Sequence, residues 1–385
     1  MSEMETNPKR LRRHPPDRMP LTRRGALASL VGAAVAPHGL DGDQGKPPSP
    51  GVPWLAEVQR PPAKLPADAP RLTELLVGRR GRPIKTRAGW RRRRRELLRA
   101  WRTFLGPAPY ARRTVPRLEV LATDRRAGVV RQRVRYQVEP GEWVEAYLLK
   151  PLEVSEPRPG VAVFHSTVAH SILQPAGLEG RPEMAFGLKL ARRGYVALCP
   201  RNYLWPTNHE IQAQQQAQRF LERHPRCKGM ARMLADARLT IDLLASLPEV
   251  DVRRLGSVGH SLGAKEVLYL AAFDERVKVT ISSEGGIGTR FSNWDAPWYL
   301  GPDIGGEDFP REHHELLALA APRPFLLVGG DSADGDRSWP FIEAVLPLAQ
   351  LYGSPLPVGL FNHRQGHAVP PLAERRIAEW FDRYL

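Results

Sequence analysis

From about residue 115 onward, short apolar runs alternate with amphipathic stretches, a pattern that predicts β-strands alternating with α-helices. The strand pattern occurs at Val129–Val138, Trp143–Lys150, Gly160–Phe164, the run that begins at Arg254, Val277–Ser283, Pro324–Gly330 and Pro357–Phe361. The helical pattern occurs at Ala264–Phe273, Pro340–Leu351 and Pro371–Leu385. The first two strands are separated only by Glu139–Glu142 and are expected to form an antiparallel hairpin. The predicted fold class is α/β, with a mostly parallel central sheet and helices on both faces.

One of these strands runs into Gly259–Gly263, which reads Gly-His-Ser-Leu-Gly and leads directly into a helix. Glycines at both second neighbours of Ser261 allow a sharp strand-to-helix turn that exposes the serine hydroxyl. The helix N-terminus would then offer backbone N–H groups, first that of Leu262, to a developing oxyanion. The pattern predicts that Ser261 is a nucleophile.

A nucleophilic serine needs a histidine base, which in a strand-turn-helix context of this kind follows later in the chain. The strand Pro357–Phe361 opens into a loop that holds His363 and His367. We expect His367 to be the base, because Gly366 lets the loop approach the serine closely and His367 lies deeper in the loop.

The acid that orients the histidine has several candidates. Asp334 follows the glycines that end the strand Pro324–Gly330, and Asp331 lies closer to that strand. We favour Asp334, with Asp331 next and Asp336 last. Glu284, at the end of the preceding strand, is a further candidate for triad acid or for substrate contact, or it could brace the loop as a helix cap or ion pair.

These residues together resemble an α/β-hydrolase. Gly259–Gly263, the Asp331–Asp334 loop and Gly366–His367 are most similar to dienelactone-hydrolase-like and acetylxylan-esterase-like bacterial members. The resemblance covers residues 115–385 and is strongest from Met230 onward. It implies a Ser-His-acid triad acting through an acyl-enzyme.

Lys265 and Glu284 also resemble glucuronoyl esterases, and this resemblance implies that Lys265 binds sugar hydroxyls. Leu262 occupies the position where that family typically has an arginine. The second oxyanion donor is expected in the loop after Gly160–Phe164, at the backbone N–H of Ser166 or Thr167.

Two insertions follow strands at the predicted catalytic edge, residues 200–229 and 285–305, and both are expected to wall the substrate pocket. Aromatic faces suit sugar rings and guanidinium groups suit acidic groups. We therefore predict substrate contacts from Arg201, Arg290, Trp294 and Trp298.

Composition adds limits to this picture. The 385 residues are 42% hydrophobic, and no apolar run has membrane-spanning length. Cys199 and Cys227 are too few for a disulfide framework; a bridge between them is compatible with export, but the spacing does not require one. No cluster of ligand residues indicates a metal, and the predicted chemistry needs no cofactor.

The formal charge of +16 is confined to the N-terminal part of the chain. Residues 1–113 hold 25 Lys and Arg against 9 Asp and Glu, whereas residues 114–385 hold 32 of each. A basic arm can serve export, transient contact with anionic lipid or binding to phosphate backbones. No recognisable nucleic-acid-binding motif is present, so we expect no nucleic-acid partner.

The arm divides into three predicted parts. Residues 1–36 resemble a twin-arginine export signal, with Arg23–Arg24 before the apolar stretch Ala26–Ala36. Residues 37–70 are proline-rich and are interpreted as a linker. Residues 71–114 are interpreted as a basic helical extension packed on the catalytic domain at 115–385. A periplasmic or secreted location follows from the signal, and a cytoplasmic one is the alternative.

The sequence thus predicts a serine hydrolase of carboxylic esters, of carbohydrate-esterase type, that acts on a small-molecule or carbohydrate ester. A prolyl-oligopeptidase-like peptidase and a catalytically silent binding protein on the same scaffold remain alternatives.

Overall fold

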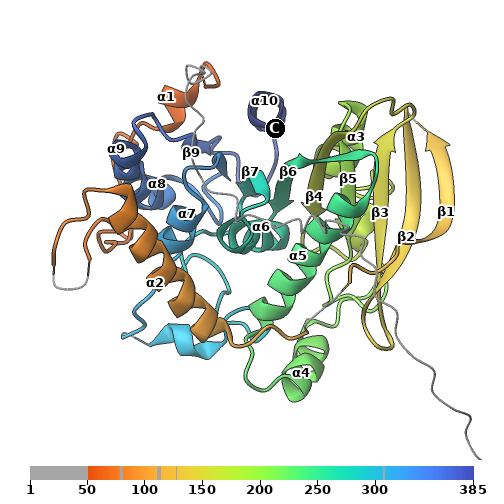
Figure 1. Ribbon diagram of the computed structural model, residues 1–385, viewed down its shortest axis with the longest axis horizontal. Helices are drawn as coiled ribbons and strands as arrows, with labels where there is room; N and C mark the ends of the chain where they lie inside the picture. Colours follow the sequence, from red (N-terminus) through yellow and green to blue (C-terminus); the bar gives the residue numbers. More distant parts are fainter. Residues whose placement is uncertain (1–50, 79–80, 111–113, 127, 307) are drawn as a thin grey trace, which may run out of the picture. The chain divides into compact units, whose positions relative to one another are not determined.

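The chain is described by a computed structural model over residues 51–78, 81–110, 114–126, 128–306 and 308–385 (Figure 1). The predicted export signal at 1–36 lies outside these residues. Nine strands form one sheet in the order β1-β2-β3-β5-β4-β6-β7-β8-β9. Their bounds are β1 Glu119–Arg126, β2 Val129–Glu139, β3 Glu142–Pro151, β4 Arg158–Phe164, β5 Val196–Pro200, β6 Val250–His260, β7 Val277–Ser283, β8 Phe325–Gly329 and β9 Val358–Asn362.

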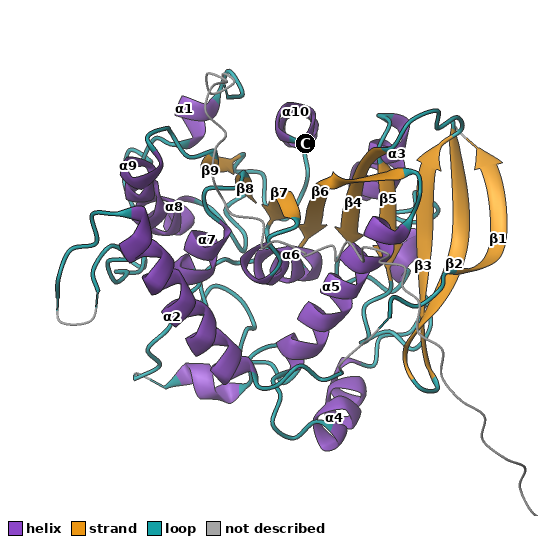
Figure 2. Cartoon of the chain, in the orientation of Figure 1, coloured by secondary structure: helices purple, strands orange, loops and turns teal. Residues whose placement is uncertain are grey.

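The sheet is antiparallel at one end and parallel through the rest (Figure 2). Strands β5, β4, β6, β7, β8 and β9 all pair in parallel. The carboxyl ends of β6 to β9 therefore lie side by side at one edge of the sheet, where loops gather in α/β proteins. The mostly parallel sheet and its opening hairpin confirm the sequence prediction.

Helices cover both faces of the sheet (Figure 1). Their bounds are α1 Leu55–Val58, α2 Arg87–Leu105, α3 Phe186–Arg192, α4 Ala213–Arg223, α5 Gly229–Ser246, α6 Leu262–Phe273, α7 His314–Ala320, α8 Trp339–Val345, α9 Ala349–Tyr352 and α10 Pro371–Tyr384. Alternation along β8 shows the two layers: Phe325 and Leu327 pack in the core with α6 and α7, whereas Leu326 and Val328 pack with α3 and α10.

Helix α2 carries the basic part of the N-terminal extension and is anchored by its apolar stripe. Trp90, Leu97, Trp101 and Leu105 recur at helical spacing and are almost fully buried in the core shared with α6 and α7. The Trp101 Nε1–H donates to Glu315 on α7 over 2.7 Å. The stripe fixes the helix on the body, which leaves its many arginines on the other faces.

The segment at 51–59 is packed, which differs from the linker interpretation of residues 37–70. Val52, Trp54 and Val58 are buried, and the Trp54 ring lies 5.5 Å from that of Trp380 on α10. The Gln59 side chain donates to two carbonyls at β9, the edge strand of the sheet. The apolar residues among the prolines therefore cover an edge that would otherwise be open.

No helix in the described part of the chain has the length and apolar character needed to cross a bilayer. Cys199 and Cys227 are both buried free thiols, so the disulfide left open by the sequence is not formed.

Candidate active site

Strand register brings the predicted catalytic loops together. His260 at the end of β6 pairs with Ser283 at the end of β7, so Ser261 and Glu284 leave the sheet side by side. The Ser261 N–H donates to Ser283 O over 2.8 Å, and the Glu284 N–H donates to Val328 O on β8 over 2.9 Å. On the far side of β8, the His363 N–H donates to Gly329 O, which places the histidine loop next in the row.

Ser261 occupies a strained turn between β6 and α6. Its φ of 58° and ψ of −115° lie outside the regions that non-glycine residues prefer. The serine caps α6, and the Leu262 N–H at the first position of that helix has no acceptor among the described residues. The turn thus places Ser261 between β6 and α6, directly before the free N-terminus of that helix.

The two flanking glycines are required by close contacts. A Cβ on Gly259 would lie 2.2 Å from the carbonyl of Gly263, and one on Gly263 would lie 2.3 Å from Phe164 O on β4. Such separations are far below van der Waals contact, so any side chain at either position would displace the turn. The glycines let α6 begin directly against β4 and β6.

His367 is held by Glu284. Its Nδ1 lies 3.3 Å from Glu284 Oε2, and the Glu284 carboxylate is almost fully buried. That carboxylate also accepts the backbone N–H groups of Gly330 and Ala333 in the loop after β8. With Nδ1 engaged in this way, Nε2 is the ring nitrogen of His367 that remains available to accept a proton.

The structure therefore revises our order of acid candidates. Asp334, which we favoured, does not contact His367: its carboxylate accepts the N–H groups of Gly286 and Ile287 over 2.7 and 2.8 Å and the Ser338 hydroxyl. Burial raises the pKa of Asp334. Asp331 is solvent-exposed and accepts from Asn362. The Asp334 carboxylate, from the loop after β8, thus binds backbone N–H groups of the loop after β7, and the Glu284 carboxylate, from the loop after β7, binds those of the loop after β8. Of these two carboxylates, that of Glu284 contacts His367.

His260 packs against His367. It is buried, its ring centroid lies 4.5 Å from that of His367, and its Nδ1 lies 3.0 Å from Ser283 Oγ. Burial, followed by the neighbouring His367, lowers the pKa of His260 to about 3. His260 is therefore neutral at ordinary pH and packs against the His367 ring.

The two sequence candidates for the second oxyanion donor differ in their surroundings. The N–H of Ser166 is buried and donates to Gln174 Oε1 over 3.2 Å. Thr167 is exposed and lines the same cavity as Ser261, and its N–H has no acceptor among the described residues. Thr167 is thus the better placed of the two to complete an oxyanion hole with Leu262.

Ser261, Glu284 and His367 line one small cavity of about 110 Å³. Side chains from both insertions wall it, and these include Leu204, Trp205, Ile211, Ser292, Asn293, Trp298 and Tyr299. The expectation that the two insertions face the catalytic edge agrees with this lining. Sequence reasoning named Trp205 among the aromatic residues of the insertions, but it assigned no role to Ser292 or Asn293, whose only signal was their position in the second insertion.

Lys265 enters the cavity from α6 as a buried amine. Its Nζ donates to Ser292 Oγ over 2.8 Å and to Asn293 Oδ1 over 3.1 Å, and it lies 4.4 to 4.5 Å from the ring centroids of Trp294 and Tyr299. Burial lowers the pKa of Lys265 to about 7. No carboxylate of the described residues forms an ion pair with it, so its polar partners there are the Ser292 hydroxyl and the Asn293 amide oxygen.

Of the other four residues predicted to contact substrate, one lines the cavity and three do not. Trp298 lines the cavity, whereas Trp294 is fully buried beneath Lys265 and donates its Nε1–H to Gly286 O. Arg201 pairs with Glu145 and lines a neighbouring cleft instead. Arg290 is solvent-exposed and contacts Gly306 O. The structure does not bring these two arginines or Trp294 to the cavity wall.

The described residues contain no group of three or more His, Cys, Asp or Glu side chains arranged to hold a metal ion.

Comparisons with known proteins agree with this architecture. Residues 144–296 match the model of the dienelactone hydrolase family. A glucuronoyl esterase from Solibacter usitatus has a similar structure, with a TM-score of 0.65 at 17% identity over 84% of this chain and 99% of that one. For a glucuronoyl esterase from Teredinibacter turnerae the TM-score is 0.59 at 19% identity, over 81% and 89% of the two chains.

A third similar structure is a protein from Bacteroides fragilis assigned as an acetyl xylan esterase, with a TM-score of 0.56 at 15% identity over 72% and 76% of the chains. Among curated proteins, the sequence has no match. At these identities the likeness establishes the fold, and the predicted α/β-hydrolase fold is confirmed.

Proposed function

We propose that this chain with an α/β-hydrolase fold is a serine esterase that cleaves carboxylic esters. One observation carries the proposal. Ser261 at a strained turn and His367, whose ring is held by the buried carboxylate of Glu284, line a single cavity beside free backbone N–H groups.

The residues suffice for a two-step reaction. The Ser261 oxygen attacks the acyl carbon while His367 Nε2 accepts its proton, and Glu284 stabilises the imidazolium that forms. The N–H groups of Leu262 and Thr167 bind the oxyanion. His367 then protonates the leaving alcohol. In the second step it deprotonates the water that releases the acid and frees Ser261.

We propose a carbohydrate ester as the substrate class. Trp298 and Tyr299 offer aromatic faces to the C–H side of a sugar ring, and Lys265 with Asn293 offers polar contacts to its hydroxyls. The similar structures named glucuronoyl esterase and acetyl xylan esterase support this class.

A panel of substrates tests the proposal. We expect hydrolysis of acetylated xylo-oligosaccharides or of glucuronate methyl esters with kcat/KM well above that for simple acetate esters. Proline-containing peptide anilides serve as the contrasting substrates. Cleavage of the anilides in preference to every ester would overturn the esterase proposal, and a folded protein inactive on the whole panel would favour a silent scaffold.

Lys265→Met is expected to raise stability and to weaken substrate binding. Because the folded state lowers the pKa of Lys265 from 10.5 to about 7, the unfolded chain binds more protons between these values, and stability increases as the pH rises through this window. Methionine removes this penalty, so the melting temperature should rise most at or below pH 7. KM for sugar esters should also rise. A variant with a lower melting temperature and unchanged KM would contradict both roles.

We also propose that the chain is exported through the twin-arginine route, on the basis of Arg23–Arg24 and the apolar stretch that follows them.

A further inference from the structure

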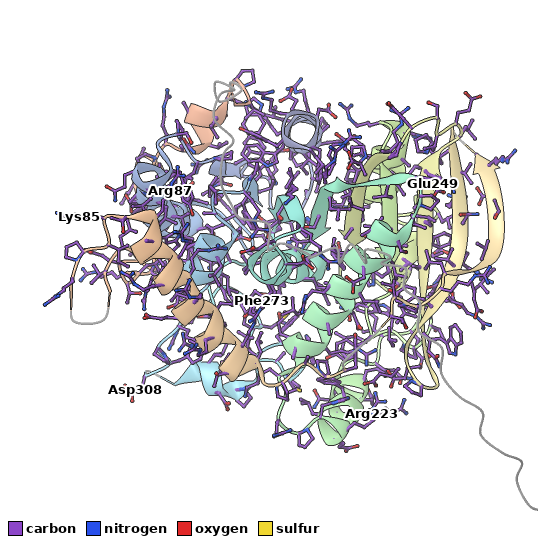
Figure 3. All side chains as sticks on the ribbon, viewed as in Figure 1. Lys85, Arg87, Arg223, Glu249, Phe273 and Asp308 are labelled. Carbon is purple, nitrogen blue, oxygen red and sulfur yellow. The ribbon has the colours of Figure 1, made fainter. Side chains whose placement is uncertain are left out.

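A second cavity, of about 760 Å³, lies between α2 and α5, away from the candidate active site. Phe273, labelled in Figure 3, is the last residue of α6 and lines this cavity. Ser261 caps the opposite end of the same helix. The 12 residues of α6 span about 18 Å, so the two cavities are separate. We name the second one the arginine groove.

Five arginines line the arginine groove: Arg95, Arg99, Arg102, Arg226 and Arg238. No acidic side chain of the described residues lines it. Arg95, Arg99 and Arg102 follow one stripe of α2 at i, i+4 and i+7, so their like charges repel along the helix. Within the described residues, only Arg238 has an ion-pair partner, Asp274 at 3.8 Å. The groove therefore has strong positive charge that the surrounding side chains leave largely unneutralised.

The floor of the arginine groove is apolar. It is formed by Leu98, Leu105, Ala231, Leu234 and Phe273, and Pro107 with Pro109 closes one end. Thr103 is the one hydroxyl among the lining side chains. An apolar floor contributes little binding free energy for a ligand rich in hydroxyls, but it contributes favourable free energy when a ligand buries hydrocarbon against it.

The end wall is fixed by the fold. Gly106 adopts φ of +89°, and a Cβ there would lie 2.0 Å from Arg226 O. The Lys228 N–H donates to Leu105 O over 2.8 Å, and the Cys227 thiol donates to Pro107 O. These contacts join the end of α2 to the start of α5, so the hollow between the two helices is built by specific contacts.

We propose that the arginine groove binds a small amphiphile that has a carboxylate head and a hydrocarbon body. Guanidinium groups pair with carboxylates in bidentate geometry, and the apolar floor would bury the hydrocarbon. The volume is within the range of about 300 to 1,000 Å³ that is typical of small-molecule sites. The site does not depend on the esterase proposal, because none of its lining residues lines the Ser261 cavity.

Titration calorimetry with octanoate tests the proposal on the whole protein. We expect octanoate to bind more tightly than acetate, 1-octanol or octylammonium, each of which lacks one feature of the amphiphile. Arg95→Gln/Arg99→Gln/Arg102→Gln should weaken octanoate binding about tenfold or more, equivalent to about 1.4 kcal/mol or more. Arg91→Gln/Arg92→Gln, which removes exposed arginines of the same helix outside the groove, should leave binding unchanged.

A second variant guards against unfolding of the triple mutant. Ala235→Glu places one carboxylate among the lining residues on α5 and should also weaken octanoate binding. Equal binding of octanoate to wild type and to both groove variants would overturn the site, as would equal binding of 1-octanol. Stronger binding of an oligouronate than of octanoate, lost in the same variants, would overturn the amphiphile as its ligand.

Discussion

Ser261→Ala is expected to lower ester turnover by about a millionfold, because loss of the nucleophile removes the whole covalent pathway. Stability should change by less than about 1 kcal/mol. Alanine keeps the Cβ and the backbone hydrogen bond from residue 261 to Ser283 O, so the turn at φ 58° should be retained. Initial rates on a responsive ester, with thermal melting in parallel, measure both effects.

Ser332→Ala is the matched control. Ser332 is a solvent-exposed serine in the loop after β8, close to the cavity but outside its lining. It should keep activity within about twofold of wild type, as surface changes of this size usually do. Turnover by Ser261→Ala at a comparable rate would show that another group is the nucleophile.

Glu284→Gln is expected to lower kcat by roughly 10³- to 10⁴-fold, the scale seen when the acid of a triad becomes an amide. The amide no longer stabilises an imidazolium at His367, and it presents an NH₂ group toward N–H donors that now meet a carboxylate. Single-turnover rates on an activated ester would separate this effect from substrate binding.

Two aspartates provide the comparison for Glu284. Asp331→Asn changes an exposed carboxylate and should alter kcat by no more than about twofold. Asp334→Asn weakens a buried acceptor of three hydrogen bonds, so we expect a loss of about 1 to 3 kcal/mol in stability and a smaller loss in kcat than for Glu284→Gln. A folded Asp334→Asn with the largest loss in kcat would restore Asp334 as the acid.

Much of the fold could be predicted because buried strands and amphipathic helices carry clear periodic patterns. The strand Val277–Ser283 agrees with β7 at both ends. Strand β1 was missed, since it is an edge strand whose residues are almost all exposed and lack an apolar face. The predicted helix Pro340–Leu351 is interrupted at Leu346–Leu348 by a 3₁₀ turn that contains Pro347, which cannot donate in an α-helix.

The candidate site could be proposed from the sequence only where local motifs define it. Ser261 lies within the motif Gly259–Gly263, and His367 directly follows Gly366, so short motifs were enough to single out both residues as candidates. The acid depends instead on how the loops after β7 and β8 cross in space. Glu284 has φ of 53°, and Asp334 reaches back to the loop after β7. The spacing of these residues along the chain does not predict which loop contacts which.

Fluorophosphonate labelling of the purified protein, followed by peptide mapping, tests the central claim most directly. An activated serine should form one covalent adduct, at Ser261, that is absent in Ser261→Ala and strongly reduced in His367→Ala. An adduct at another residue, or no adduct on a folded protein that hydrolyses esters, would contradict the assignment of Ser261 as the nucleophile.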